Sequence, residues 1–174
     1  MVIHCLWLVG KAKNKGHGNK LLQNAVEDAK RLGMHGIVGM SAEKGGWLPN
    51  KKIFLNNGFE KVDEIAPNFS LYAKAFNKNA PKPRFYPMIE KNQKECSQGA
   101  VIIFTDQCPY ITDLVEELKT ANTKDKVKAI KINNCKEAQQ NGVYPYGTYC
   151  IICDGEISLY KHSSKKEIYS VLNK

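Results

Sequence analysis

The sequence lacks a long apolar run. No stretch of its 174 residues is both uncharged and apolar over the roughly 18 residues that a membrane-spanning helix needs. The first ten residues, MVIHCLWLVG, have no basic region before their apolar run and no small-residue cleavage site, so they do not resemble a signal peptide. We therefore expect a cytoplasmic protein that has no membrane partner.

The sequence also lacks a compact cysteine framework. Its six cysteines are widely spaced, which favours free thiols in a reducing compartment over structural disulfides. The segment CIIC, residues 150–153, lies in an apolar strand, where side chains three residues apart point to opposite faces. A zinc site would need two further ligands at suitable spacing. We expect neither a disulfide nor a metal there.

Two nucleotide-binding patterns are absent from the stretch KAKNKGHGNKLL, residues 11–22. A Walker loop ends in Gly-Lys-Ser/Thr, but Gly18 is followed by Asn19. A dinucleotide fingerprint needs a third glycine three residues after Gly18, where Leu21 stands. The stretch is therefore not a standard site for a nucleoside triphosphate or a dinucleotide.

Acidic residues are scarce in one half of the chain. Residues 1–84 hold 14 Lys and Arg against 6 Asp and Glu, whereas residues 85–174 hold 12 against 11, within a net charge of +9. A basic half predicts an anionic partner: a nucleic acid, a membrane surface or a phosphorylated cofactor. Residues 10–20 contain none of the aromatic side chains that stack on bases. We therefore expect no nucleic-acid partner and favour a phosphorylated cofactor.

A proline-containing stretch at residues 77–87 separates two halves, each of which alternates strands with helices. Helical spacing of apolar residues and a following glycine, Gly33, predict the first helix. The first half is predicted to hold strand 3–9, helix 18–32, strand 36–40, a helix from Pro49 to before Gly58, and strands 59–64 and 69–76. Such alternation predicts α/β units.

The second half is predicted to begin with strand 100–105 and a helix from Pro109. Strand 126–132, a short helix, strand 148–153, another strand and a last helix follow. Ser164 and Glu167 form a capping-box pattern at the start of that last helix. Each half is thus predicted to be a small α/β domain.

The basic turn between the first strand and helix predicts an anion site, because the first amides of a helix lack internal partners and carry partial positive charge. A solvated connection is the alternative for such a turn. Lys13-x-x-Gly16-x-Gly18 resembles the acetyl-CoA motif of GNAT acetyltransferases, Arg/Gln-x-x-Gly-x-Gly/Ala. Further on, IFLNNGFEKV resembles the common ending of that family, an aromatic residue followed by three others and Gly-Phe.

This resemblance implies that residues 1–78 form the C-terminal half of a GNAT fold that binds acetyl-CoA. By position, Leu8 and Val9 would meet the pantetheine arm, and Lys13 takes the Arg/Gln place. The residues implied to line the pyrophosphate are Asn14, Lys15, Gly16, His17, Gly18 and Asn19. The implied activity is an N-acetyltransferase in which an amine, of a small molecule or a peptide, attacks the thioester directly.

Two departures from the family pattern qualify this expectation. The chain begins at what would be the fourth strand of the family, so we expect a fragment, a second subunit that completes the fold, or lost activity. An exposed first strand would give a reason to form a homo-oligomer. Phe54 stands where many members carry a tyrosine that protonates the leaving thiolate, and phenylalanine has no such proton. His4, Cys5 and His17 are candidates for assistance, and no base is assigned.

In the second half, Cys108 precedes a helix that begins with a proline, a position that favours thiolate. The element order and the letters CPY resemble a glutaredoxin or thioredoxin-like fold, although Ile111 replaces the second cysteine and Gly147 stands near the usual cis-proline. The segment DQCP is similar to one in acetyltransferases with a YoaP-like C-terminal domain. We expect a linker at 79–95 and a thioredoxin-like domain at 96–174. The alternative function is a monothiol redox or thiol-sensing protein that uses Cys108; a cysteine that merely caps a helix is also open.

Overall fold

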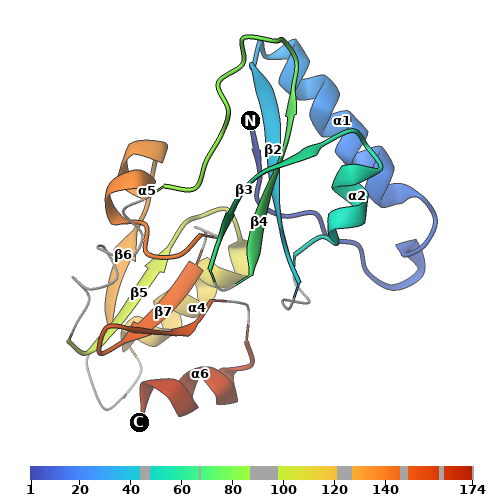
Figure 1. The fold of residues 1–174 in the computed structure, drawn as a ribbon. Coiled ribbons are helices and arrows are strands. Elements are labelled where there is room, and N and C mark those ends of the chain that lie inside the picture. Colours follow the sequence, from blue (N-terminus) through green and yellow to red (C-terminus); the bar gives the residue numbers. More distant parts are fainter. Residues whose placement is uncertain are drawn as a thin grey trace. The chain divides into compact units, whose positions relative to one another are not determined.

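The structure is a computed structural model that describes residues 1–43, 48–66, 68–86, 98–120, 127–145, 149–160 and 163–173. Cys96, Gly147 and the predicted linker residues 87–95 lie outside these ranges. The chain divides into two compact units, Met1–Phe85 and Tyr86–Lys174. Each unit is described by itself below (Figure 1).

The N-terminal unit contains a mixed four-stranded sheet in the order β1-β2-β4-β3 among its described residues. The strands are β1 (Val2–Ile3), β2 (Gly36–Ala42), β3 (Glu60–Ile65) and β4 (Phe69–Ala75). β1 runs parallel to β2, and β4 is antiparallel to both β2 and β3. The parallel pair is joined through a helix, as such a connection requires. The order of elements is the one predicted from the sequence.

Helix α1 (His17–Arg31) connects the parallel strands and buries one stripe of side chains. Leu22, Val26 and Ala29 are its buried residues, at the spacing of one helix face. The helix ends in a glycine cap: Gly33 has φ +67°, its N–H donates to Lys30 O at 3.0 Å, and Met34 N–H donates to Ala29 O at 3.0 Å. The predicted helix and its glycine stop are confirmed.

Short helix α2 (Lys51–Leu55) lies over the same face of the sheet as α1 (Figure 1). Its one buried residue, Phe54, is fully buried. The ring stacks on Tyr72 of β4, with ring centroids 5.5 Å apart and planes 10° apart. A β-carbon on Gly39 of β2 would lie 2.4 Å from the Phe54 ring, so the strand needs a glycine directly below it. The core of this unit is formed by Leu22, Val26, Ala29, Ile37, Phe54, Phe59 and Tyr72.

The first strand is shorter than predicted. The ladder between β1 and β2 covers only Val2–Val38 and Ile3–Gly39, and residues 4–9 form no strand. Apolar side chains of that segment serve another purpose, because Leu6 packs against the core and Leu8 lies against the start of α1. The prediction of a strand over 3–9 is wrong: burial against the helices outweighs continuation of an edge ladder.

The C-terminal unit contains a second mixed sheet, in the order β6-β5-β7-β8 among the described residues. Strands β5 and β6 are parallel, whereas β7 is antiparallel to β5 and β8. In chain order the elements are β5 (Ala100–Phe104), α4 (Pro109–Thr120), β6 (Lys128–Lys131), α5 (Cys135–Asn141), β7 (Tyr149–Cys153), β8 (Glu156–Leu159) and α6 (Lys165–Leu172). The predicted order is confirmed, and so is the capping box of Ser164 and Glu167.

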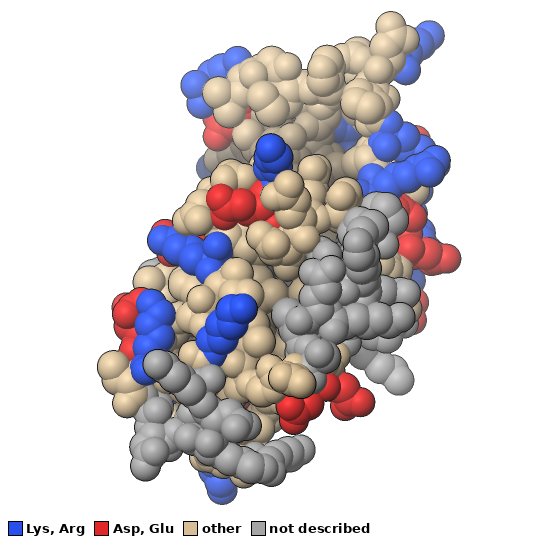
Figure 2. Space-filling view, turned by 90° about the vertical axis from the view of Figure 1, so that its left-hand side faces the viewer, with Lys and Arg blue, Asp and Glu red and all other residues tan. Residues whose placement is uncertain are grey.

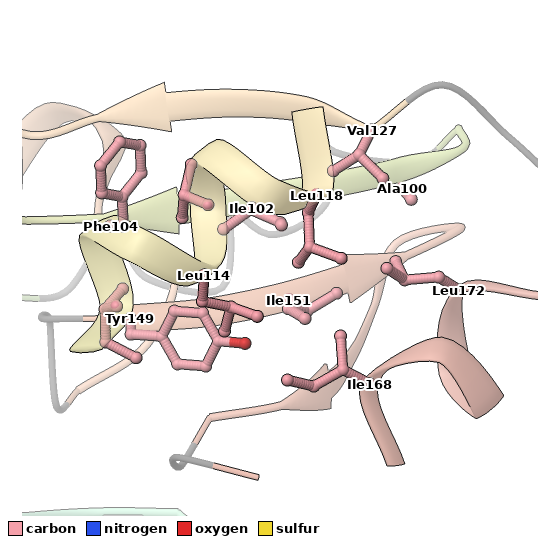
Figure 3. Packing of buried hydrophobic residues seen from close by; sticks show 12 residues of the cluster. Ala100, Ile102, Phe104, Leu114, Leu118, Val127, Tyr149, Ile151, Ile168 and Leu172 are labelled. Carbon is pink, nitrogen blue, oxygen red and sulfur yellow. The ribbon is translucent and has the colours of Figure 1, made fainter. Parts of the chain in front are cut away.

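Helices α4 and α6 enclose the core of this unit with strands β5 and β7 (Figure 3). Leu114 and Leu118 of α4 point toward Ile102 and Ile151 of the sheet. The hydroxyl of Tyr149 reaches into this apolar core and has no hydrogen-bond partner among the described residues. Burial raises the pKa of Tyr149, because the charged phenolate is poorly solvated there.

Candidate functional site

The basic turn, residues 10–19, follows the non-strand segment 4–9 as a compact series of tight bends. A 3₁₀ turn, η1 (Gly10–Ala12), is followed by Lys13 N–H donating to Gly10 O at 3.2 Å. Asn14 then adopts φ +60° and Gly16 adopts φ +77°. Asparagine and glycine are the residues that tolerate this left-handed conformation best. The turn can therefore reverse direction before α1 because Asn14 and Gly16 stand at the two left-handed positions.

Helix α1 begins without a side-chain cap. Gly16 occupies the N-cap position, where no side chain accepts a hydrogen bond from the first turn. The first internal bond runs from Lys20 N–H to Gly16 O at 3.2 Å. Helix geometry thus leaves four backbone N–H groups without intrahelical acceptors, those of Gly16, His17, Gly18 and Asn19. These groups and the helix dipole make the turn a favourable place for an anion.

The two glycines of the motif, Gly16 and Gly18, are required for different structural reasons. A β-carbon on Gly16 would meet nothing within 4 Å, so this glycine is required by its positive φ and its surroundings are open. A β-carbon on Gly18 would lie 3.2 Å from Cδ1 of Ile53 and 3.6 Å from Cδ1 of Leu8. Gly18 therefore allows α1 to approach α2 and the segment after β1 closely.

Asn57, which the sequence did not single out, fixes the start of α1 against α2. Its Nδ2 donates to Oδ1 of Asn19 at 2.9 Å and to the carbonyl of Ile53 at 2.7 Å. Nζ of Lys74 in turn donates to the carbonyl of Asn57 at 2.8 Å. The two Asn19–Asn57 amides are 38 residues apart in the chain, so only the folded structure brings them together.

The predicted cofactor residues lie together around this turn, and most of them are exposed. Leu8 and Gly18 are half-buried; the exposed ones are Val9, Lys13, Asn14, Lys15, Gly16, His17 and Asn19. Of the residues considered for assistance, His4 is half-buried whereas Cys5 and His17 are exposed. Phe54 is fully buried under Tyr72. It therefore presents neither a proton nor a surface to a ligand.

Charge around the turn is of one sign. The first 26 residues contain no Asp or Glu, and no ion pair forms with Lys11, Lys13, Lys15 or Lys20 within the described residues. In the C-terminal unit, by contrast, Lys119, Lys131 and Lys165 lie within 2.7 Å of carboxylate oxygens. On the face shown in Figure 2, the Lys and Arg side chains form small, separate patches with acidic side chains among them. The turn is thus a cationic segment without internal neutralisation.

Cys108 lies at the junction of β5 and α4. Its carbonyl accepts from Ile111 N–H at 3.0 Å, and its half-buried side chain packs against the C-terminal core. No disulfide is formed among the described cysteines: Cys5, Cys108, Cys135, Cys150 and Cys153. Cys150 is buried and Cys153 is half-buried on strand β7. Cys153 packs against the core that contains Tyr149 and Ile151, and Cys150 is not part of that core, as expected for side chains three residues apart in a strand.

Neither a metal cluster nor a spanning helix is found in the part of the chain that the structure describes. No group of three or more His, Cys, Asp or Glu is arranged to hold an ion among those residues. Over the same residues, every helix is too short or too polar to cross a bilayer.

Comparison with known proteins gives one informative match. The chain is 32% identical over 176 aligned positions to a protein of Bacillus subtilis (strain 168) described as "Uncharacterized N-acetyltransferase YoaP". The alignment covers 99% of this chain and 69% of that relative. No protein-family model and no solved structure matches the chain.

Proposed function

The chain belongs to the family of the N-acetyltransferase YoaP, and from this membership we propose that it uses acetyl-CoA to acetylate an amine. We propose further that the turn at residues 10–19 binds the pyrophosphate of the cofactor. The observation that carries this placement is the uncapped start of α1. It offers four backbone N–H groups beside unpaired lysines, which is the chemistry that a pyrophosphate needs.

The residues present fit this donor. Gly16 stands in open space, so a phosphate can approach the backbone without a side chain in the way. Lys13 and Lys15 add charge attraction on the exposed side of the turn. The half-buried Leu8 and exposed Val9, which precede the turn, offer apolar surface for the pantetheine arm. Both belong to the segment that leaves the β1–β2 ladder after Ile3.

Acetyl-CoA supplies an activated acetyl group as a thioester. The acceptor amine forms the new C–N bond as the C–S bond breaks, the amine loses a proton to solvent, and the sulfur leaves with a proton from solvent. Phe54 is buried and has no proton to give. This chain would therefore contribute chiefly by holding the two reactants together, a contribution that can itself be large.

For the C-terminal unit we propose a thioredoxin-like fold. Support comes from the sheet order β6-β5-β7-β8 and from the parallel β5–β6 pair beside two antiparallel strands. The alternative function, a thiol reaction at Cys108, receives no support from the relative, whose description names an acetyltransferase. We also propose a cytoplasmic location, because the described cysteines form no disulfide with one another.

Calorimetric titration of the 174-residue chain with acetyl-CoA tests the proposed function. We expect saturable binding by the wild type and about tenfold weaker binding by a Lys13→Gln/Lys15→Gln double variant, because two charges near a pyrophosphate are lost. The matched control is Lys136→Gln/Lys166→Gln, which removes the same charge from exposed helix positions of the C-terminal unit. Equal affinity in both double variants would contradict the placement; no binding by the wild type would contradict the function.

A further inference from the structure

A cavity of about 380 Å³ opens beyond the carboxyl end of β2. It belongs entirely to the N-terminal unit. The lining residues come from four places in this unit. They are Ser41, Ala42 and Glu43 at the end of β2, Asn50 and Lys51 at the start of α2, Lys61 of β3, and Ser70 and Tyr72 of β4. Its volume is near the lower limit of small-molecule sites. The cavity is therefore large enough to hold a small metabolite.

Hydroxyl groups of two paired strands form one wall of the cavity. Ser41 of β2 is directly opposite Ser70 of β4, and Tyr72 follows two residues later on the same face. Ser41 and Tyr72 are only 5% and 3% exposed. The Tyr72 ring is held by its stack on Phe54. The hydroxyls of Ser41 and Tyr72 thus belong to buried side chains rather than to flexible surface groups, and Ser70 beside them is half-buried.

Charged side chains of both signs surround this wall. Nζ of Lys51 lies 3.8 Å from Oε1 of Glu43, and both side chains are more than half exposed. Nζ of Lys61 donates to Glu64, which raises the pKa of Lys61. Exposed ion pairs of this kind contribute little stability. A ligand that carries both charges can therefore replace the long Lys51–Glu43 contact at little cost.

The cavity and the start of α1 both adjoin α2. Asn50 and Lys51, at the start of α2, line the cavity. A β-carbon on Gly18 of α1 would lie 3.2 Å from Cδ1 of Ile53, which belongs to the same short helix. A molecule in the cavity would therefore contact the helix against which the start of α1 packs.

We propose that this cavity binds the acetyl acceptor and that the acceptor is a small amine that also carries a carboxylate, as a free amino acid does. Glu43 attracts the ammonium group, Lys51 and Lys61 attract the carboxylate, and Ser41, Ser70 and Tyr72 complete the hydrogen bonds. Opposite charges at the rim suit such a zwitterion better than a simple cation or anion. The role as acceptor site rests on the proposed function; the binding of the zwitterion does not.

An NMR titration of the full chain tests the binding directly. Pools of the free proteinogenic amino acids are added to ¹⁵N-labelled protein, followed by the same pools as carboxamides, which keep the amine and lose the carboxylate. We expect at least one free pool to shift the amides of Ser41, Lys51, Lys61 and Ser70, with affinity in the millimolar range, and its carboxamide form to bind about tenfold more weakly. No shift at these amides with any free pool, or equal shifts with the carboxamides, would overturn the proposal.

Charge variants sharpen this test. Lys51→Gln and Lys61→Gln should each lower the affinity for the amino-acid pool that binds by about tenfold. Lys52→Gln is the matched control, because Lys52 is the next residue of α2, is exposed and does not line the cavity. Equal weakening in all three variants would show a general charge effect and overturn the assignment of the site.

A parallel titration with acetyl-CoA separates the two proposals. Shifts at residues 13–19 with acetyl-CoA, but none at the cavity with amino acids, would leave the proposed function intact and overturn the acceptor class. Cavity shifts with amino acids, but none with acetyl-CoA, would leave the zwitterion site intact and overturn the proposed function.

Discussion

The start of α1 in the N-terminal unit is built differently from the starts of α5 and α6 in the C-terminal unit. In the C-terminal unit, α5 is capped by Asn134, whose Oδ1 accepts from Glu137 N–H at 2.9 Å, and α6 is capped by Ser164 with Glu167. In the N-terminal unit, α2 is likewise capped by Asn50, whose Oδ1 accepts from Lys52 N–H at 2.9 Å, but α1 begins at a bare glycine with lysines before it. A capped start uses its amides internally, whereas an uncapped one keeps them for a ligand. The contrast marks α1 as the place to look for an anion.

An uncapped start must be held in position by other contacts. In α1 this is achieved by the close approach at Gly18 and by the hydrogen bonds of Asn57. The same contrast therefore predicts where substitutions are costly. For α1 the sensitive positions are Gly18, which packs against α2, and Asn57, whose side-chain amide bonds to Asn19. For α5 and α6 they are the capping residues.

The largest effect is expected from Gly18→Val, which inserts a branched side chain between α1, Ile53 and Leu8. We expect a loss of about 2–3 kcal/mol in the free energy of unfolding, as for other overpacked sites. Urea denaturation followed by tryptophan fluorescence measures it, because Trp7 and Trp47 both belong to the N-terminal unit. Gln23→Val, at an exposed position of the same helix, controls for helix propensity, and a similar loss in that control would contradict the packing role.

Asn57→Ala should have the next largest effect. The substitution removes two hydrogen bonds and leaves the carbonyl of Ile53 and the amide of Asn19 without this partner. We expect a loss of about 1–2 kcal/mol, measured by the same fluorescence-monitored denaturation. Asn56→Ala changes the neighbouring exposed asparagine and should be close to neutral. If the two variants unfold alike, the link between α1 and α2 contributes nothing.

Ser164→Ala removes the cap of α6 and should cost about 1 kcal/mol. Hydrogen exchange of the α6 amides, followed by NMR, detects this loss locally. Ser170→Ala is the matched control, because Ser170 is an exposed residue of the same helix. Unchanged exchange in Ser164→Ala would show that the capping box adds nothing to α6.

The smallest effect concerns pH. Hydrogen bonds from the backbone and side chain of Asn133 lower the pKa of Glu137 below its ordinary 4.5. A carboxyl whose pKa is lowered by folding stabilises the fold above the unfolded pKa and loses that contribution as the pH falls through the folded one. The protection of α5 should therefore decline slightly as the pH is lowered below 4.5. In Glu137→Gln this acid dependence should disappear, and its persistence would assign it to another group.

Local chemistry in the sequence was sufficient to predict several of these features. Gly33 marked the end of α1, Ser164 with Glu167 marked the start of α6, and the spacing of Lys13, Gly16 and Gly18 marked the turn. Each depends on residues close together in the chain. Gly18 was nevertheless interpreted incompletely, because its packing partner Ile53 is 35 positions away and belongs to another helix.

Features that depend on tertiary contact could not be predicted. Residues 4–9 form an apolar run like that of a strand, but Leu6 packs against the core and Leu8 lies against the start of α1, while Trp7 and Val9 are exposed. The bond between Asn57 and Asn19 and the cavity beside Ser41 and Ser70 both require paired elements that are distant in sequence. Composition and local spacing do not determine which distant elements come into contact, so they could not predict these features.

The absence of a side chain at Gly39 has a consequence for how the sheet aligns. Phe54 leaves room beneath its ring only for a residue without a β-carbon. A slip of β2 by one residue would place Val38 or Met40 there, and a slip by two would place Ile37 or Ser41. Every such alternative meets the ring of Phe54, in addition to turning buried residues outward when the slip is odd. One aromatic residue on a five-residue helix thus helps to select a single alignment of the strands.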